Sequence, residues 1–101
     1  MGSRTDLQNL LEDIMNSRNV YFQPPESVQL VYPCIKYSRD SGKTYFANDK
    51  PYYIKIAYQL ILIDSNPDSE IIPRIEQLPR CTFERHFTSD NLHHYVYNLY
   101  Y

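Results

Sequence analysis

Glycine, cysteine and tryptophan are scarce in this sequence, and each shortage excludes a class of site. The chain has 101 residues, with 2 Gly, 2 Cys and no Trp. So few glycines exclude the glycine-rich loops that hold phosphates in nucleotide-binding proteins. The two cysteines, Cys34 and Cys81, have no metal-ligand spacing and are too few for a disulfide framework. We therefore expect two buried, reduced thiols.

A surplus of charge and a long apolar run are also missing. The formal net charge is −2, with acidic and basic residues interspersed. Because no basic block is present to neutralise phosphates, we expect no binding to the nucleic-acid backbone. The longest aliphatic run, LILI at 60–63, is far too short to cross a membrane. The first residues, MGSRTDLQNLLEDIM, lack the pattern of a signal peptide, so we expect a soluble protein made in the cytosol.

Tyrosine is the residue that the sequence has in excess, with 11 Tyr beside 4 Phe. Its large apolar ring and its hydroxyl group suit half-buried sheets and interfaces between chains, and both interpretations remain open. Alternation in the segment 92–101 places tyrosines on both faces of a strand. Both faces then need a cover, and one cover can be a neighbouring subunit.

Two stretches have the spacing of short helices. LQNLLEDIM (7–15) carries one apolar stripe, and Thr5-x-x-Gln8 before it has the pattern of a capping box. We expect residues 1–4 to be disordered. The second stretch, 71–78, has apolar residues at helical spacing, but Pro73 limits it to a short helix.

Strand patterns fill most of the remaining chain. Residues 39–51 hold the turn formers, so we expect a long hairpin connection there, and Asp90-Asn91 forms the turn of a second hairpin. The expected strands are VYFQPP (20–25), YPCIKYS (32–38), YYIKIAYQLILID (52–64), RCTFERHFTS (80–89) and the segment 92–101.

Alternation within 80–89 places four side chains on one side of that strand: Cys81, Phe83, Arg85 and Phe87. Taken together, these patterns predict one α+β domain over residues 1–101. It has an antiparallel β-sheet, with an N-terminal helix and a second short helix packed on one face.

The histidines and carboxylates that could form a metal or catalytic site have structural explanations in this sequence. Three histidines, His86, His93 and His94, cluster in the sequence, which raises the question of a metal site. His93 and His94 are consecutive in a strand and point to opposite faces, so they cannot easily share one metal ion, and we expect surface histidines. The carboxylates between 64 and 76 flank a helix start, where the helix dipole favours them. We therefore expect no enzymatic activity, catalytic residue, metal or cofactor. Exposed strand edges and aromatic side chains favour association with other copies or with a larger assembly.

Several segments resemble the small tail-completion proteins of long-tailed bacteriophages, which are also called tail terminators or head–tail joining proteins. The resemblance is most specific in DxxPDSEI, from Asp64 to Ile71, and in LPxCxFxRxFTxDNL, within Leu78 through His93. It extends to the LQNLLEDIM helix, NVYFQPP (19–25), YPCIKY (32–37) and 58–101, and it is weakest in 38–51.

The resemblance implies a structural protein of the virion neck that is made in the cytoplasm of the bacterial host. Such proteins form a ring, usually of six copies, that caps the tail tube and joins the tail to the head connector. The implied partners are further copies, the tail tube protein and the connector or stopper proteins, while genomic DNA passes through without specific binding. A head-completion or stopper protein of the same neck, and a small intracellular regulator that binds one protein, remain alternatives.

A ring needs contact residues, and we assign two groups by hypothesis. For any one of them, the alternative is a solvated charge or a tyrosine packed within its own subunit. Polar contacts to another subunit or to the connector are assigned to Arg39, Asp40, Lys43, Lys50, Arg85 and His93, and an aromatic contact surface to Tyr95, Tyr97 and Tyr101.

Overall fold

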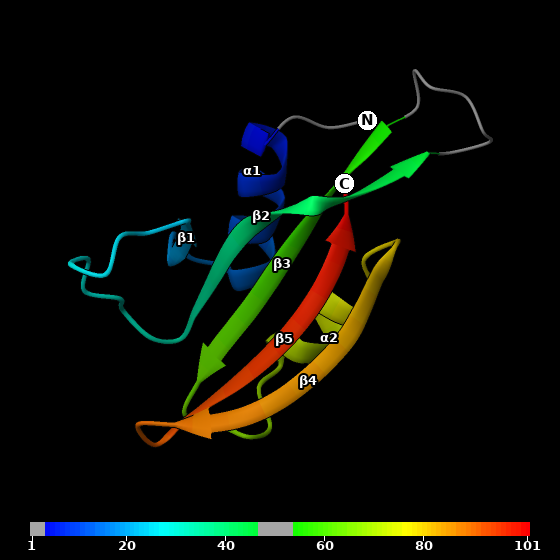
Figure 1. The fold of residues 1–101 in the computed structure, drawn as a ribbon. Coiled ribbons are helices and arrows are strands. Elements are labelled where there is room, and N and C mark those ends of the chain that lie inside the picture. Colours follow the sequence, from blue (N-terminus) through cyan, green and yellow to red (C-terminus); the bar gives the residue numbers. More distant parts are fainter. Residues whose placement is uncertain (1–3, 47–53) are drawn as a thin grey trace.

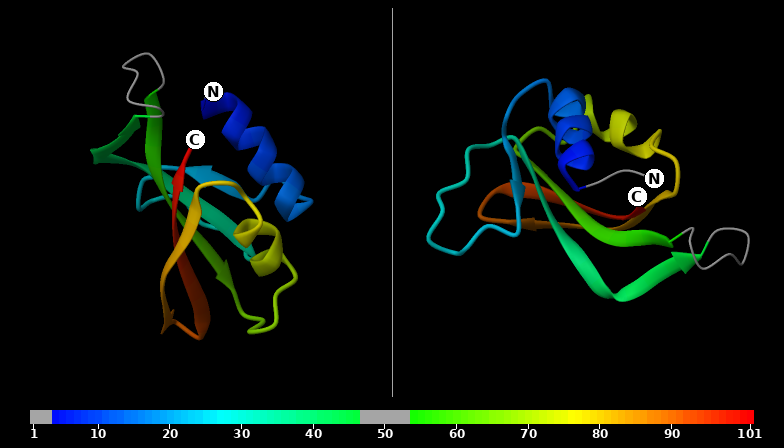
Figure 2. Two further views of the ribbon diagram at one scale, coloured as in Figure 1. Left: turned by 90° about the vertical axis from the view of Figure 1, so that its right-hand side faces the viewer. Right: turned by 90° about the horizontal axis from the view of Figure 1, so that it is seen from above.

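Five strands form one sheet in the order β1-β2-β3-β5-β4, and both helices lie against the same face of it (Figures 1 and 2). The computed structural model describes residues 4–46 and 54–101. The elements are α1 (Arg4–Met15), β1 (Val20–Phe22), β2 (Cys34–Phe46), β3 (Ile54–Asp64), α2 (Ile71–Glu76), β4 (Cys81–Ser89) and β5 (Leu92–Tyr100). The predicted α+β class with two helices is confirmed. We call the side that carries α1 and α2 the helix face and the opposite side the open face.

The sheet is mixed, so the prediction of a purely antiparallel sheet is wrong at one strand. β1 runs parallel to β2, from the pair Val20–Ile35 to the pair Phe22–Tyr37, while the other neighbouring strands are antiparallel. A parallel pair needs a long connection that returns the chain to the same end of the sheet. Residues 23–33 provide this connection.

The β2–β3 hairpin is longer than predicted. β2 continues to Phe46, so residues 39–46 are part of a strand and not of a connection; residues 47–51 lie outside the described part. Pairing with β3 overrides the turn-forming composition, and the register shifts between Arg39 and Thr44. This arm of two strands projects beyond the rest of the sheet (Figure 1).

One glutamine of helix α1 makes hydrogen bonds to two strands of the sheet. Tyr37 Oη donates to Gln8 Oε1 at 2.6 Å, and Gln8 Nε2 donates to the carbonyl of Val20 at 3.1 Å. The predicted capping box is therefore wrong: Thr5 lies inside the helix, and Gln8 is directed to β1 and β2. Arg4 is the first helical residue, contrary to the expected disorder of residues 1–4, and residues 1–3 lie outside the described part.

The core lies between the helix face and the two helices. Pro73 sits in the first turn of α2, where its missing amide costs little, and the predicted short helix is confirmed. Arg74 ties α2 to α1, because its Nη1 donates to the carbonyl of Ile14 at 3.2 Å. The buried core residues are Leu7, Leu11, Met15, Val20, Ile35, Tyr37, Tyr58, Leu60, Leu62, Ile71, Ile75, Tyr97 and Leu99.

Tyr97 belongs to this core, so its assignment to a contact surface is wrong. Its side chain is 0% exposed, and its hydroxyl donates to Glu76 Oε2 at 3.3 Å. Burial, followed by the charge of Glu76, raises the pKa of the Tyr97 phenol. The residue faces inward because the odd-numbered positions of β5 point toward the helices.

A bulge in β4 reverses which side chains point to each face of the strand beyond it. The register with β5 shifts between Phe83 and Arg85, which leaves Glu84 as an extra residue. Phe83 remains on the helix face, where its ring lies 5.6 Å from that of Tyr97. Arg85 and Phe87 turn to the open face, so the prediction that both share a side with Phe83 is wrong.

The C-terminal hairpin is confirmed. Asp90 and Asn91 have φ of 52° and 63°, as a two-residue type I′ turn requires, and Ser89 pairs with Leu92 across it. At the other end, Tyr101 and Ile56 exchange two backbone hydrogen bonds of 3.0 and 3.3 Å. The end of the chain is thus bound to β3.

We predict that Tyr97→Ala lowers the free energy of unfolding by about 3–5 kcal/mol, because it leaves a cavity under α2. Tyr97→Phe, the matched control, keeps the ring and removes only the hydrogen bond to Glu76, so it should cost about 1 kcal/mol. Urea unfolding followed by circular dichroism measures both. Equal, small losses for the two variants would contradict the core assignment.

Candidate assembly surface

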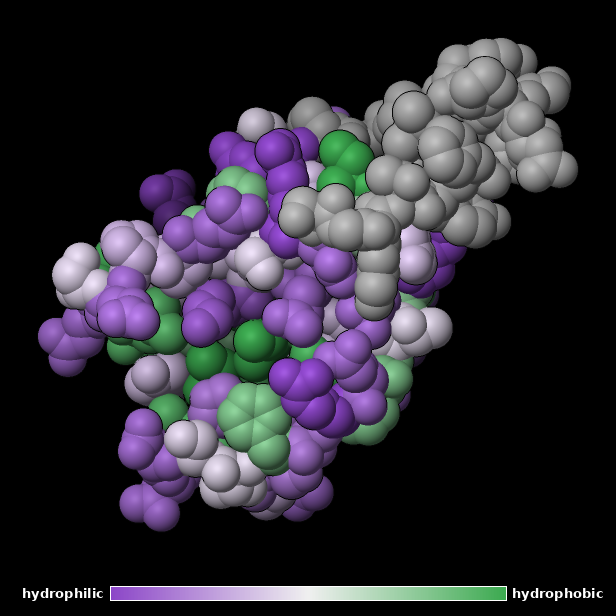
Figure 3. Space-filling model, viewed as in Figure 1, coloured by the Kyte–Doolittle hydropathy of each residue, from purple (hydrophilic) through white to green (hydrophobic). Residues whose placement is uncertain are grey.

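The open face has an apolar centre between two cations. Ile61 of β3, which is half-buried, pairs with Val96 of β5, which is fully buried within the subunit. The same row of the sheet continues to Lys36 of β2 and Arg85 of β4. Figure 3 shows this side of the molecule, with apolar atoms gathered over its middle and hydrophilic residues around them. An apolar centre with a polar rim is the usual anatomy of a protein–protein contact.

A polar row crosses the open face beside this centre. Ser38, Gln59 and Asn98 are register partners on β2, β3 and β5. Asn98 Nδ2 donates to Glu84 Oε1 at 3.1 Å, and Glu84 forms an ion pair with Arg85. The side-chain amides of this row can donate and accept hydrogen bonds with another polypeptide. The charge of Arg85 is already paired with Glu84 within the subunit.

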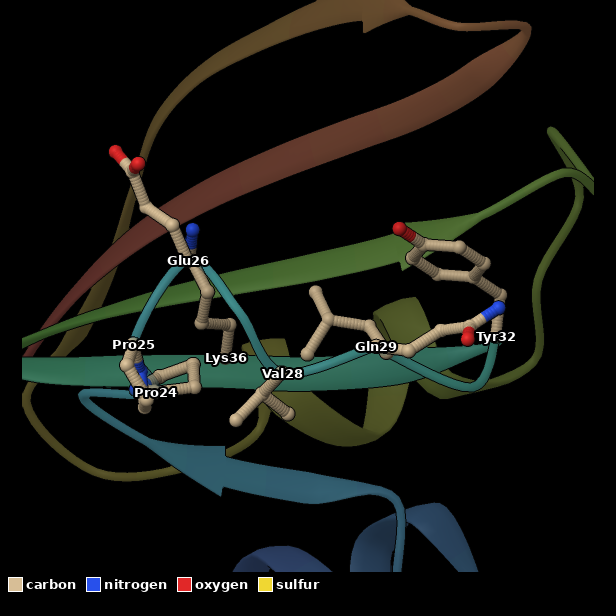
Figure 4. Close-up of a pocket in the computed structure, with 8 residues that line it drawn as sticks. Pro24, Pro25, Glu26, Val28, Gln29, Tyr32 and Lys36 are labelled. Atoms are coloured by element: carbon tan, nitrogen blue, oxygen red, sulfur yellow. The ribbon is translucent and has the colours of Figure 1, made fainter.

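Two shallow hollows lie beside β2, and the second of them reaches Ser38 and Gln59 of the polar row. The larger, of about 450 Å³, lies where the β1–β2 connection passes beside β2, and Figure 4 shows Lys36 extending from β2 toward that connection. The second hollow, of about 350 Å³, shares Pro24 and Lys36 with the first. The first is lined by Pro24, Pro25, Glu26, Val28, Gln29, Leu30, Tyr32 and Lys36, and the second adds Gln23, Tyr37, Ser38, Gln59 and Ile61.

Strand β4 forms an exposed edge of the sheet. Its strand neighbour is β5, and among the described residues no strand pairs with its other side. Every side chain of β4 except Cys81 is exposed. Phe83 is 53% exposed on the helix face and Phe87 is 38% exposed on the open face, so aromatic surface flanks this edge on both sides.

The polar residues that we assigned to contacts do not form one patch. Arg39 is exposed and its guanidinium lies 5.8 Å from the ring centre of Phe22. His93 is six positions away along β3, because Arg39 is opposite Tyr58 and His93 is opposite Asp64. Asp40 is half-buried on β2. The side chain of Lys43 and the whole of Lys50 lie outside the described part.

The remaining tyrosines of the assigned surface lie between core and solvent. Tyr95 and Tyr101 are half-buried, pack against the core cluster, and face the helix side. Tyr95 Oη donates to the carbonyl of Pro67 at 3.3 Å, which ties β5 to the segment before α2. Their contact role stays a prediction.

The sequence analysis did not predict that Phe83 and Phe87 form an exposed aromatic surface at the β4 edge. Alternation placed Phe83 and Phe87 on one side of the strand. The bulge puts them on opposite faces, and the alternating pattern of the sequence does not reveal that bulge. A charged pair, Glu84-Arg85, within an otherwise alternating strand is the one local feature that coincides with the bulge.

The thiols are sheltered from reaction. Cys34 is fully buried on the open face of β2, and burial raises its pKa to about 11, an effect that Lys36 partly opposes. Cys81 is half-buried, and burial, followed by the charge of Glu76, raises its pKa to about 11. Neither cysteine forms a disulfide; the predicted burial is confirmed for Cys34, and it is wrong for Cys81, which is half-buried.

Comparisons with known proteins return no relative: no family model matches the chain, and neither a curated protein nor a solved structure does. None of the described helices has the length and apolar character needed to span a membrane. Within residues 4–46 and 54–101, no group of three or more His, Cys, Asp or Glu is placed to hold a metal ion.

We predict that both thiols react slowly in the folded protein. At pH 8 a group with a pKa near 11 is thiolate in about one molecule per thousand, and thiolate is the reactive form. Alkylation by iodoacetamide, followed by mass spectrometry, should be at least about tenfold slower in buffer than in denaturant. Equal rates in the two conditions would contradict the burial described above.

Proposed function

We propose that this chain is a structural protein of a bacteriophage neck, where copies form a ring that caps the tail tube and joins it to the head connector. The protein then acts by assembly and not by catalysis. Its partners are further copies, the tail tube protein and the connector proteins, and genomic DNA passes without specific binding. The resemblance of residues 64–71 and 78–93 to tail-completion proteins supports this proposal.

The observation that carries the proposal is the exposed edge at β4. A row of unpaired backbone groups can add a strand from another chain, and the hydrogen bonds of that addition are independent of sequence. The exposed rings of Phe83 and Phe87 flank the edge and bury further apolar area when a neighbour docks. A ring also needs a second, different surface on each copy, and the open face with its hollows is available for that role.

The backbone pattern of the hairpin identifies which amides of β4 point outward. Ser89 and Leu92 flank the two-residue turn and form a hydrogen-bonded pair. Such pairs alternate along an antiparallel ladder, so the amide of Thr88 points away from β5. A substitution at Thr88 therefore tests the exposed edge without removing a hydrogen bond between β4 and β5.

We predict that Thr88→Pro prevents ring assembly while the subunit remains folded, because proline removes an outward donor from the edge and fixes φ. Thr88→Val is the matched control, since it keeps the amide and a β-branched side chain. Negative-stain images of each variant mixed with purified tail tubes measure assembly, and circular dichroism checks the fold. Rings formed equally well by the proline variant would show that β4 is not a contact edge.

We further predict that a labelled copy lies at the head–tail junction of the virus that encodes it. A peptide tag at the N-terminus, detected by gold-labelled antibody on purified particles, locates the chain. Label on tail-less, DNA-filled heads would instead indicate a head-completion or stopper protein. Particles without label, whose necks are complete, would overturn the proposal and favour a regulator that binds one intracellular protein.

A further inference from the structure

Two histidines from neighbouring strands meet on the helix face of the terminal hairpin. His86 of β4 and His93 of β5 have their Nε2 and Nδ1 atoms 3.1 Å apart, and their rings stack with centres 5.3 Å apart. His94 points to the open face, where it stacks on Phe87. The partner of His93 is thus a residue seven positions earlier, and the hairpin register brings the two together.

The separation of the two nitrogens matches that of two ligands on one metal ion. Metal–imidazole bonds measure about 2.0–2.1 Å, so neighbouring ligands at angles between square and tetrahedral have nitrogens about 2.9–3.4 Å apart. In the metal-free pair, one imidazole donates its proton to the other at this distance. A divalent ion that replaces the shared proton lies off the line between the two nitrogens, so each ring turns until its nitrogen lone pair points at the ion.

The surroundings hold the rings in place and leave the site open to solvent. Tyr95 packs beside the pair, with its ring centre 4.7 Å from that of His86 and 6.2 Å from that of His93. Its hydroxyl is anchored on the carbonyl of Pro67. His86 is exposed, and Asp64, on the next strand, is the register partner of His93. A cation therefore reaches the pair from solvent, while Asp64 is buried and its Oδ1 accepts a hydrogen bond from the amide of Asn66.

We propose that His86 and His93 form a bidentate site for a divalent transition-metal ion of the kind that imidazole prefers, Zn²⁺, Ni²⁺ or Cu²⁺. Water molecules complete the coordination. The site lies on the opposite face of β5 from His94 and does not depend on ring assembly. Mg²⁺, which prefers oxygen ligands, is not bound there.

The test is titration of the full chain with Zn²⁺ by calorimetry, with His86→Gln as the disrupting variant. We expect the variant to bind Zn²⁺ at least about tenfold more weakly, because one of the two protein ligands is gone. His94→Gln is the matched control and should bind as the unaltered chain does. Unfolding temperatures measured without metal check that both variants are folded.

Substoichiometric Cu²⁺ then locates the ion, because a paramagnetic centre broadens nearby NMR signals. The imidazole signals of His86 and His93 should broaden before that of His94. Cys81→Ser separates binding at the thiol from binding at the histidines and should leave the affinity unchanged. The proposal is overturned if His86→Gln and His94→Gln bind alike, if His94 broadens first, or if only Cys81→Ser weakens binding.

Discussion

Burial of the helix face of β3 is the constraint on which the other features depend. Leu60 and Leu62 are fully buried there, and each such side chain contributes about 1.5–3 kcal/mol when it leaves water. β3 also pairs with β2 on one side and β5 on the other, so its register fixes both neighbours. Since successive residues alternate between faces, that burial decides which side chains are left on the open face.

Much of the fold could be predicted because its determinants are local. The α1 stripe, the alternation of β3 and the Asp90-Asn91 turn each depend on residues within one segment. The parallel pairing of β1, the length of β2 and the bulge at Glu84 depend instead on strands that are distant in sequence. Residues 39–46 have the composition of a turn, yet they are part of β2, in which Arg39 and residues 44–46 pair with β3.

The contact surface was harder to predict for a physical reason. Alternating tyrosines show that a strand is covered on one face, but the pattern is the same whether the cover is a helix of the same subunit or another chain. For Tyr97 the cover is α2, which has six residues and lies directly over it. The meeting of His86 with His93 was not predicted, although it follows from the register that the Asp90-Asn91 turn sets, which pairs His86 with Tyr95.

The extra residue at Glu84 has a geometric consequence for any assembly built on this edge. A strand that is one residue longer than its partner curves, and β4 bends visibly across the sheet (Figure 1). A strand added to it from another molecule would inherit that bend. Repeated docking would then rotate each molecule by a constant angle relative to the last, and the size of that angle decides between a closed circle and an endless fibre.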